Sequence, residues 1–185
     1  MKTRVLLPIF ALLIFSVCSP QRESSQLPAG HPTRLEEMIQ SLLDIATRGD
    51  EQSLRLKLES IFPTADRVQR LLNPSRLTEG LGEVFEVEIK QSALRELPSV
   101  LVEARQLRFD QIKLSRVSPQ SGTTNAPGDL ALLEQLKDRS GLYTVRLLKE
   151  GKSKGLRLSG WLYIEGHGWI SLLKLGEEIE RRGQR

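Results

Sequence analysis

Apolar residues in the first half of the chain recur every three or four positions, the spacing that places them on one face of an α-helix. This spacing predicts helices over 33–48, 51–61 and 64–72, followed by a longer helical region over 78–105. Thr33 and Glu36 have the form of a capping box, with Thr33 as the N-cap residue. Pro98 is expected to kink or divide the long region, because proline lacks the amide hydrogen that a helix interior uses. Residues 54–58 and 84–89 also alternate between apolar and polar types, so a strand is the alternative in both segments.

Alternation of apolar and polar residues, typical of half-buried strands, dominates the second half of the chain. The alternating runs predict strands over 109–117, 142–149, 155–165 and 169–173. A loop over 118–128 and a short helix over 129–137 separate the first run from the others, and the last three runs are joined by short turns. The predicted fold class is therefore α+β, with N-terminal helices packed on a C-terminal antiparallel sheet of about four strands, arranged as a cone or an open meander.

The two faces of the third alternating run differ in chemistry and indicate a candidate site. Strict alternation places Leu156, Leu158, Leu162 and Ile164 on one face, which we assign to the core. It places Arg157, Trp161 and Tyr163 on the other face, and Trp169 joins them if the following glycine turn is a three-residue loop. With a two-residue turn, Trp169 faces the core instead. Arg157, Trp161, Tyr163 and Trp169 are therefore the candidate ligand-binding residues of an aromatic cleft. The alternative is that a helix or the C-terminal tail covers this face, where aromatic pairs would only stabilise the sheet.

The amino-terminal segment has the layout of an export signal. Lys2 and Arg4 precede the uncharged stretch 5–17, and the composition becomes polar directly after Cys18, the only cysteine in the chain. A membrane-spanning helix needs roughly 20 apolar residues, so this stretch is short for a transmembrane anchor. With one cysteine, the chain has no disulfide framework of its own.

The residues around Cys18 resemble a bacterial lipoprotein signal, whose box is a branched apolar residue, two small residues and then cysteine. Here the box reads Phe15-Ser16-Val17-Cys18, in which Ser16 fits while Phe15 and Val17 are larger than the usual residues. The resemblance implies that Cys18 carries lipid and becomes the first residue of the mature protein. Cleavage after Cys18 to give a soluble secreted protein, or retention of the leader as an uncleaved anchor, are the alternatives.

These observations divide the chain into a leader, a link and one domain. We expect a signal peptide over 1–17, a lipidated Cys18 with a flexible tether over 18–32, a single domain over 33–180 and a tail over 181–185. Removal of Lys2 and Arg4 with the leader lowers the formal charge from +4 to +2. The remaining charges are interspersed along the sequence, which argues against a nucleic-acid-binding protein.

No motif in the sequence identifies a catalytic or metal-binding centre, and we expect no cofactor. His167 lies between two glycines without a nearby second histidine or cysteine, so an exposed turn residue is the simpler interpretation. The order of helices first, an antiparallel sheet last and a C-terminal Gly168-Trp169 hairpin is similar to cone-shaped domains of the nuclear transport factor two-like class. Domains of that class serve as ligand pockets, enzymes or dimerisation modules.

The sequence therefore predicts an exported lipoprotein of the cell envelope, held to a membrane by acyl chains on Cys18, and to the outer membrane if the organism has one. Its domain is expected to be non-catalytic and to bind a small apolar ligand, a protein partner or a second copy of the chain. The alternative is a secreted or periplasmic soluble protein, including an enzyme of the cone-shaped class with a polar active site in a pocket.

Overall fold

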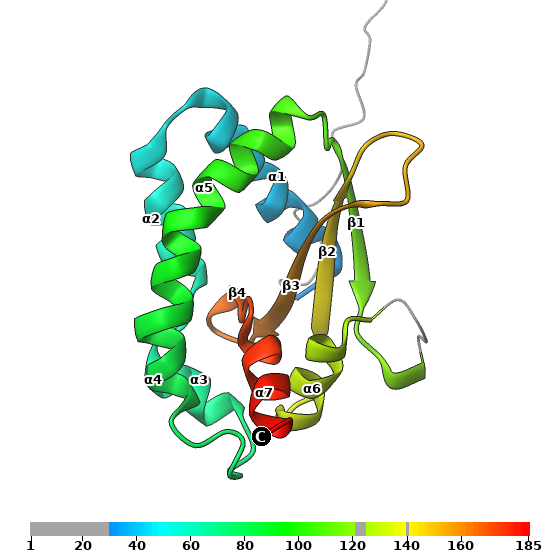
Figure 1. Ribbon diagram of the computed structural model, residues 1–185. Helices are drawn as coiled ribbons and strands as arrows, with labels where there is room; N and C mark the ends of the chain where they lie inside the picture. Colours follow the sequence, from blue (N-terminus) through cyan, green and yellow to red (C-terminus); the bar gives the residue numbers. More distant parts are fainter. Residues whose placement is uncertain (1–29, 121–124, 140) are drawn as a thin grey trace, which may run out of the picture.

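The computed structural model describes residues 30–120, 125–139 and 141–185. Within these ranges the N-terminal half is helical and the C-terminal half contains a four-stranded antiparallel sheet, so the predicted α+β class is confirmed (Figure 1). The helices that precede the sheet are α1 (Pro32–Arg48), α2 (Glu51–Ile61), α3 (Ala65–Leu71), α4 (Leu81–Val84), the π-helix η2 (Phe85–Ile89) and α5 (Lys90–Gln106).

The starts and interruptions of these helices differ in part from the sequence expectation. α1 begins with Pro32, and His31 is the N-cap residue, since its Nδ1 accepts a hydrogen bond from the backbone N–H of Thr33 (3.3 Å). The predicted capping box with Thr33 as N-cap is therefore wrong, because proline already starts the helix. α5 continues through Pro98, so the proline does not divide it. The irregularity falls on 85–89, where a π-helix stands in place of the alternative strand.

The sheet is an antiparallel meander whose strands lie in sequence order. The strands β1 (Gln111–Arg116), β2 (Leu142–Leu148), β3 (Gly155–Ile164) and β4 (Gly168–Ser171) pair in the order β1-β2-β3-β4. The helix α6 (Pro127–Gln135) lies between β1 and β2 in the chain, and α7 (Leu175–Gly183) follows β4. The sequence pattern did not indicate α7, which extends into 181–185, the segment expected to be a tail.

A β-bulge in β3 determines which side chains share a face of the sheet. On β2 the single residue Thr144 lies opposite two residues of β3, Ser159 and Gly160. Gly160 has a φ of +77°, and its carbonyl accepts a hydrogen bond from the Leu172 N–H (2.7 Å). A Cβ at position 160 would lie 2.7 Å from the Leu172 carbonyl oxygen, so the site requires glycine. The extra residue reverses the alternation of every side chain that follows it in β3.

The bulge corrects the predicted faces of β3. Trp161 pairs with Tyr143, which lies two residues along β2 from the partner of Leu158, so Trp161 and Leu158 share a face. Tyr163 is on that face as well, and Leu162 is on the opposite one. The prediction that Leu158 and Leu162 share the core face is therefore wrong. Both side chains are nevertheless buried, because helices pack on both sides of this part of the sheet.

The two faces can be defined from the strand pairing. The first face carries Ile112, Leu114, Arg116, Tyr143, Val145, Leu147, Leu156, Leu158, Trp161, Tyr163, Trp169 and Ser171. The second face carries Lys113, Ser115, Leu142, Thr144, Arg146, Arg157, Leu162 and Ile170. α1 contacts β1 and α2 contacts β4, so the N-terminal helices cover the first face (Figure 1). α6 contacts β3 on the second face, and α7 packs against α6 at the same end of the sheet (Figure 1).

The core between the N-terminal helices and the first face is continuous. Leu35 of α1, Phe85 of η2 and Leu101 of α5 are buried in one cluster with Val145 and Leu147 of the sheet. The amphipathic spacing that predicted the helices thus matches the face that each helix presents to the sheet or to its neighbours.

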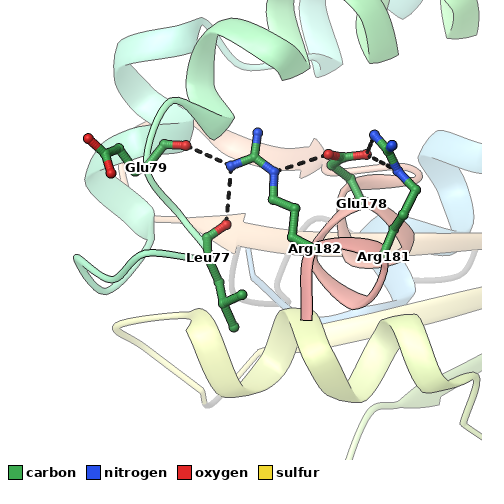
Figure 2. Close-up of polar contacts among 5 residues, drawn as sticks. All are labelled: Leu77, Glu79, Glu178, Arg181 and Arg182. Atoms are coloured by element: carbon green, nitrogen blue, oxygen red, sulfur yellow. Dashed lines mark hydrogen bonds and ion pairs between the residues drawn. The ribbon is translucent and has the colours of Figure 1, made fainter. Parts of the chain in front are cut away.

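Arg182 links the C-terminal helix, α7, to the segment between α3 and α4 (Figure 2). Arg182 Nη1 donates to the carbonyl oxygens of Leu77 (3.4 Å) and Glu79 (2.7 Å), and Arg182 Nε donates to Glu178 (3.0 Å). Arg181 donates to the same carboxylate. Burial alone would raise the pKa of Glu178, but the hydrogen bonds from the two arginines outweigh it and hold the pKa below its ordinary value of 4.5. The contact joins segments that are more than 100 residues apart in the chain.

Candidate functional site

The predicted lipid-attachment residue, Cys18, lies outside the residues that the structure describes. The described chain starts at Gly30, directly before α1. Covalent geometry allows at most 3.6 Å per residue, so the chain between Cys18 and Gly30 spans at most about 43 Å. In the described part of the chain, no helix is both long and apolar enough to cross a membrane. Lipid attachment at Cys18 stays a prediction.

Three of the four predicted ligand-binding residues gather on the first face. The β3–β4 turn has three residues, 165–167, so Trp169 pairs with Tyr163 and shares a face with Trp161. The Trp169 ring packs edge-on against the rings of Tyr163 and Tyr143, each with a centroid separation of 5.6 Å. Trp161 is 3% exposed and Trp169 is 7% exposed. The cluster therefore lies within the packed core beneath the N-terminal helices.

The aromatic cluster contains two polar groups that the described residues leave unsatisfied. The indole nitrogens of Trp161 and Trp169 are buried and have no hydrogen-bond partner within the described ranges. An unsatisfied buried donor costs about 1–3 kcal/mol. Ligand binding by Trp161, Tyr163 and Trp169 stays a prediction.

Arg157 lies apart from the aromatic residues. It pairs with Arg146 of β2 on the second face, on the other side of the sheet from Trp161. Its guanidinium forms an ion pair with Asp129 of α6, and its Nε donates to the Ser159 hydroxyl (3.2 Å). The four predicted residues therefore do not form one site, because the bulge turns the aromatic side chains of β3 away from the face that carries Arg157.

Asp129 is a buried carboxylate that the sequence reasoning missed. It is 3% exposed, and it accepts hydrogen bonds from the Thr144 hydroxyl (2.9 Å) and from Arg157. Its place in the first turn of α6 favours a negative charge, and Arg157 supplies the counter-charge that a buried carboxylate needs. The cavity beside it measures about 20 Å³, room for about one water molecule. The arrangement holds α6 against the sheet. Pro127, two residues earlier, is a residue favoured in the first helical turn, so it marks the start of α6 but not the contact of Asp129 with the sheet.

The described residues do not place His167 in a metal site. The described ranges contain no group of three or more His, Cys, Asp and Glu side chains placed to hold a metal ion. His167 is exposed in the β3–β4 turn, where its Nδ1 lies 3.3 Å from the carbonyl oxygen of Glu165.

A row of cations crosses the second face of the sheet. Lys113 of β1 pairs with Arg146 of β2, which in turn pairs with Arg157 of β3. Paired residues of antiparallel strands have Cα atoms about 4.5–5.5 Å apart, so the three residues lie across roughly 10 Å of sheet. Like charges directly opposite each other destabilise a sheet, so a negative charge close to this row stabilises it. Asp129 supplies one such charge, to Arg157.

No protein-family model matches this chain, and no curated protein or solved structure matches it either. The similarity of the element order to nuclear transport factor two-like domains therefore stays a prediction.

Proposed function

We propose that this protein is a lipoprotein of the cell envelope, exported and then attached to a membrane by acyl chains on Cys18. The observation that carries the proposal is the position of the only cysteine, which directly follows the uncharged stretch 5–17 and precedes a polar segment. A cysteine used for packing would lie within the folded domain, whereas Cys18 precedes the first residue of α1, Pro32. The thiol at this position is the group that a lipid-transfer reaction requires.

The anchor sets where the domain works. One acyl chain binds a membrane only marginally, whereas two or more hold a protein there stably. Because the chain from Cys18 to Gly30 spans at most about 43 Å, the start of the domain stays within that distance of the membrane surface. The domain therefore meets partners that are themselves at or near the membrane.

The domain itself serves as a binding or structural unit in this proposal. The aromatic residues of the sheet are packed into the core, and the buried carboxylate of Asp129 is held by Arg157 and Thr144. A pocket enzyme of the cone-shaped class would use an acid or base that faces an open cavity. The space beside Asp129, at about 20 Å³, is too small for a substrate.

Metabolic labelling with a fatty-acid analogue tests the anchor. Wild-type protein should become labelled and sediment with membranes, whereas Cys18→Ala should remain unlabelled. Val17→Ala is a matched control in the same box: alanine suits the small-residue position better than valine, so this variant should be labelled at least as fully as wild type. Equal labelling of wild type and Cys18→Ala would overturn the proposal.

A further inference from the structure

Positive charge is concentrated in the β2–β3 hairpin, residues 146–157, which we name the basic hairpin. It contains five cations, Arg146, Lys149, Lys152, Lys154 and Arg157, and one carboxylate, Glu150, a net charge of +4. The whole chain from residue 18 onward has a net charge of +2, because the leader removes Lys2 and Arg4 from a total of +4. The net charge of the other residues from 18 onward is therefore −2. The excess of positive charge in the chain from residue 18 comes from this hairpin alone.

The fold places two further charges beside the strands of the hairpin. Lys113 of β1 is exposed and lies opposite Arg146, and Asp129 of α6 contacts Arg157, so one cation and one carboxylate from outside the hairpin lie beside its strands. The excess of positive charge therefore comes from the hairpin itself.

The basic hairpin is placed for contact with a large partner. Its turn projects from the end of the sheet that lies opposite α6 and α7 (Figure 1). Lys152 and Lys154 in the turn are exposed. The ammonium group of Lys149 lies 5.3 Å from the centroid of the Phe109 ring, a cation–π contact that holds this charge at the same end of the sheet.

We infer that the basic hairpin docks on the anionic headgroups of the membrane that holds the acyl chains of Cys18. The inference rests on the proposed function for the identity of that membrane. Each Lys or Arg near an anionic membrane surface strengthens binding by about fivefold, and the attraction decays over about 8 Å at physiological ionic strength. A hairpin with several cations on a short turn gains from this attraction only when it touches the headgroups, which its projection from the sheet allows.

The anchor and the hairpin can reach the same surface. Gly30 packs against the ring of Tyr163, which fixes the start of the domain near the far end of β3. Tyr163 is eight residues from Gly155, where the turn of the hairpin ends, and a strand rises about 3.3 Å per residue, so this end of the turn lies about 26 Å from Tyr163. The chain from Cys18 to Gly30 spans up to about 43 Å, which exceeds that separation. The anchored domain can therefore lie with its basic hairpin on the membrane.

The position of the aromatic side chains favours a membrane over single-stranded nucleic acid as the anionic partner. Proteins that bind single strands place aromatic rings beside their cations, so that bases can stack on them. Here the rings of Trp161, Tyr163 and Trp169 lie on the first face, on the other side of the sheet from Arg146 and Arg157 of the hairpin. The Phe109 ring is already covered by Lys149, so it does not offer an open face on which a base could stack.

Vesicle binding of the chain from residue 18, with Cys18→Ser to remove the acyl chains, tests the inference. The measurement is co-sedimentation with vesicles of phosphatidylcholine alone and of phosphatidylcholine with one quarter phosphatidylglycerol, at low and high salt. We expect binding only to the anionic vesicles and a strong loss at high salt. Lys152→Gln/Lys154→Gln should weaken the binding about 25-fold, at about fivefold for each cation.

A charge-matched control separates the hairpin from net charge. Lys57→Gln/Lys137→Gln removes the same two charges from exposed positions on α2 and after α6, and it should bind anionic vesicles as wild type does. Equal weakening in both double variants, or equal binding to neutral and anionic vesicles, would overturn docking by the hairpin. This assay is independent of Cys18 labelling: labelled protein with no anionic-vesicle binding overturns the docking alone, and binding without labelling overturns the anchor alone.

Discussion

Replacement of Gly160 by alanine tests whether the bulge in β3 organises the sheet. An alanine there adopts a φ near +77°, which costs an L-residue about 1–2 kcal/mol. Its Cβ would also lie 2.7 Å from the Leu172 carbonyl oxygen and 2.8 Å from the carbonyl carbon, which are backbone atoms that cannot rotate away. The strand must shift, and the hydrogen bond from Leu172 N–H to the Gly160 carbonyl weakens, at about 1 kcal/mol. Together with strain in the displaced backbone, the free energy of unfolding should fall by about 3–4 kcal/mol.

Gly166 is the matched control for this prediction. It has nearly the same φ, +76°, but nothing lies within 4 Å of the position its Cβ would take. Gly166→Ala should therefore cost only the conformational part, about 1–2 kcal/mol. Urea unfolding followed by tryptophan fluorescence measures both, since Trp161 directly follows the bulge. If the two variants lost the same stability, the close approach of Gly160 to Leu172 would have no energetic role, and the reasoning would be refuted.

Two further changes probe charged contacts by chemical unfolding. Arg157→Ala should lower the free energy of unfolding by about 3 kcal/mol, because it leaves the buried carboxylate of Asp129 without its cation. The same change in an Asp129→Asn background should cost less than half as much. Equal costs in both backgrounds would contradict the pairing. Glu178→Gln should make the free energy of unfolding less sensitive to acid. The folded protein holds the Glu178 pKa below its ordinary value of 4.5. The wild type therefore gains stability from this group above pH 4.5 and loses it as the pH falls through the lowered pKa. Urea midpoints at pH 7 and pH 3 measure this, and an equal fall in wild type and variant would count against it.

Local patterns in the sequence were sufficient to predict the class of the fold and the order of its main elements from α1 to β4. Helical spacing marked α1, α2 and α5, and alternation marked all four strands, because each of these segments buries one side against the core. α7 was missed because its nine residues bring only two large apolar side chains, Leu175 and Ile179, into the core. Such a short helix gains its stability from packing against α6 and from the Arg182 contacts, neither of which is a local property.

The candidate site was harder to predict for a specific reason. Period-two alternation assigns faces correctly only while the strand pairs without interruption, and the bulge at Ser159 and Gly160 shifts the register by one residue. Gly160 inside an alternating run was the available signal, since an isolated glycine in a strand often marks a bulge. Asp129 and the row through Arg146 could not be found from the sequence, because they depend on pairing between strands and on where α6 lies.

The contact between Gly30 and Tyr163 bears on how an anchored protein carries mechanical load. In the proposed anchored protein, a partner that pulled on the domain would put tension on the chain from Cys18, and this tension would enter the fold at Gly30. There the ring of Tyr163 and the first turn of α1 receive it together, and both belong to the layer in which helices and sheet are packed on each other. The force is thus shared between two elements at once, whereas a chain that entered at an edge strand could be peeled from the sheet one hydrogen bond at a time.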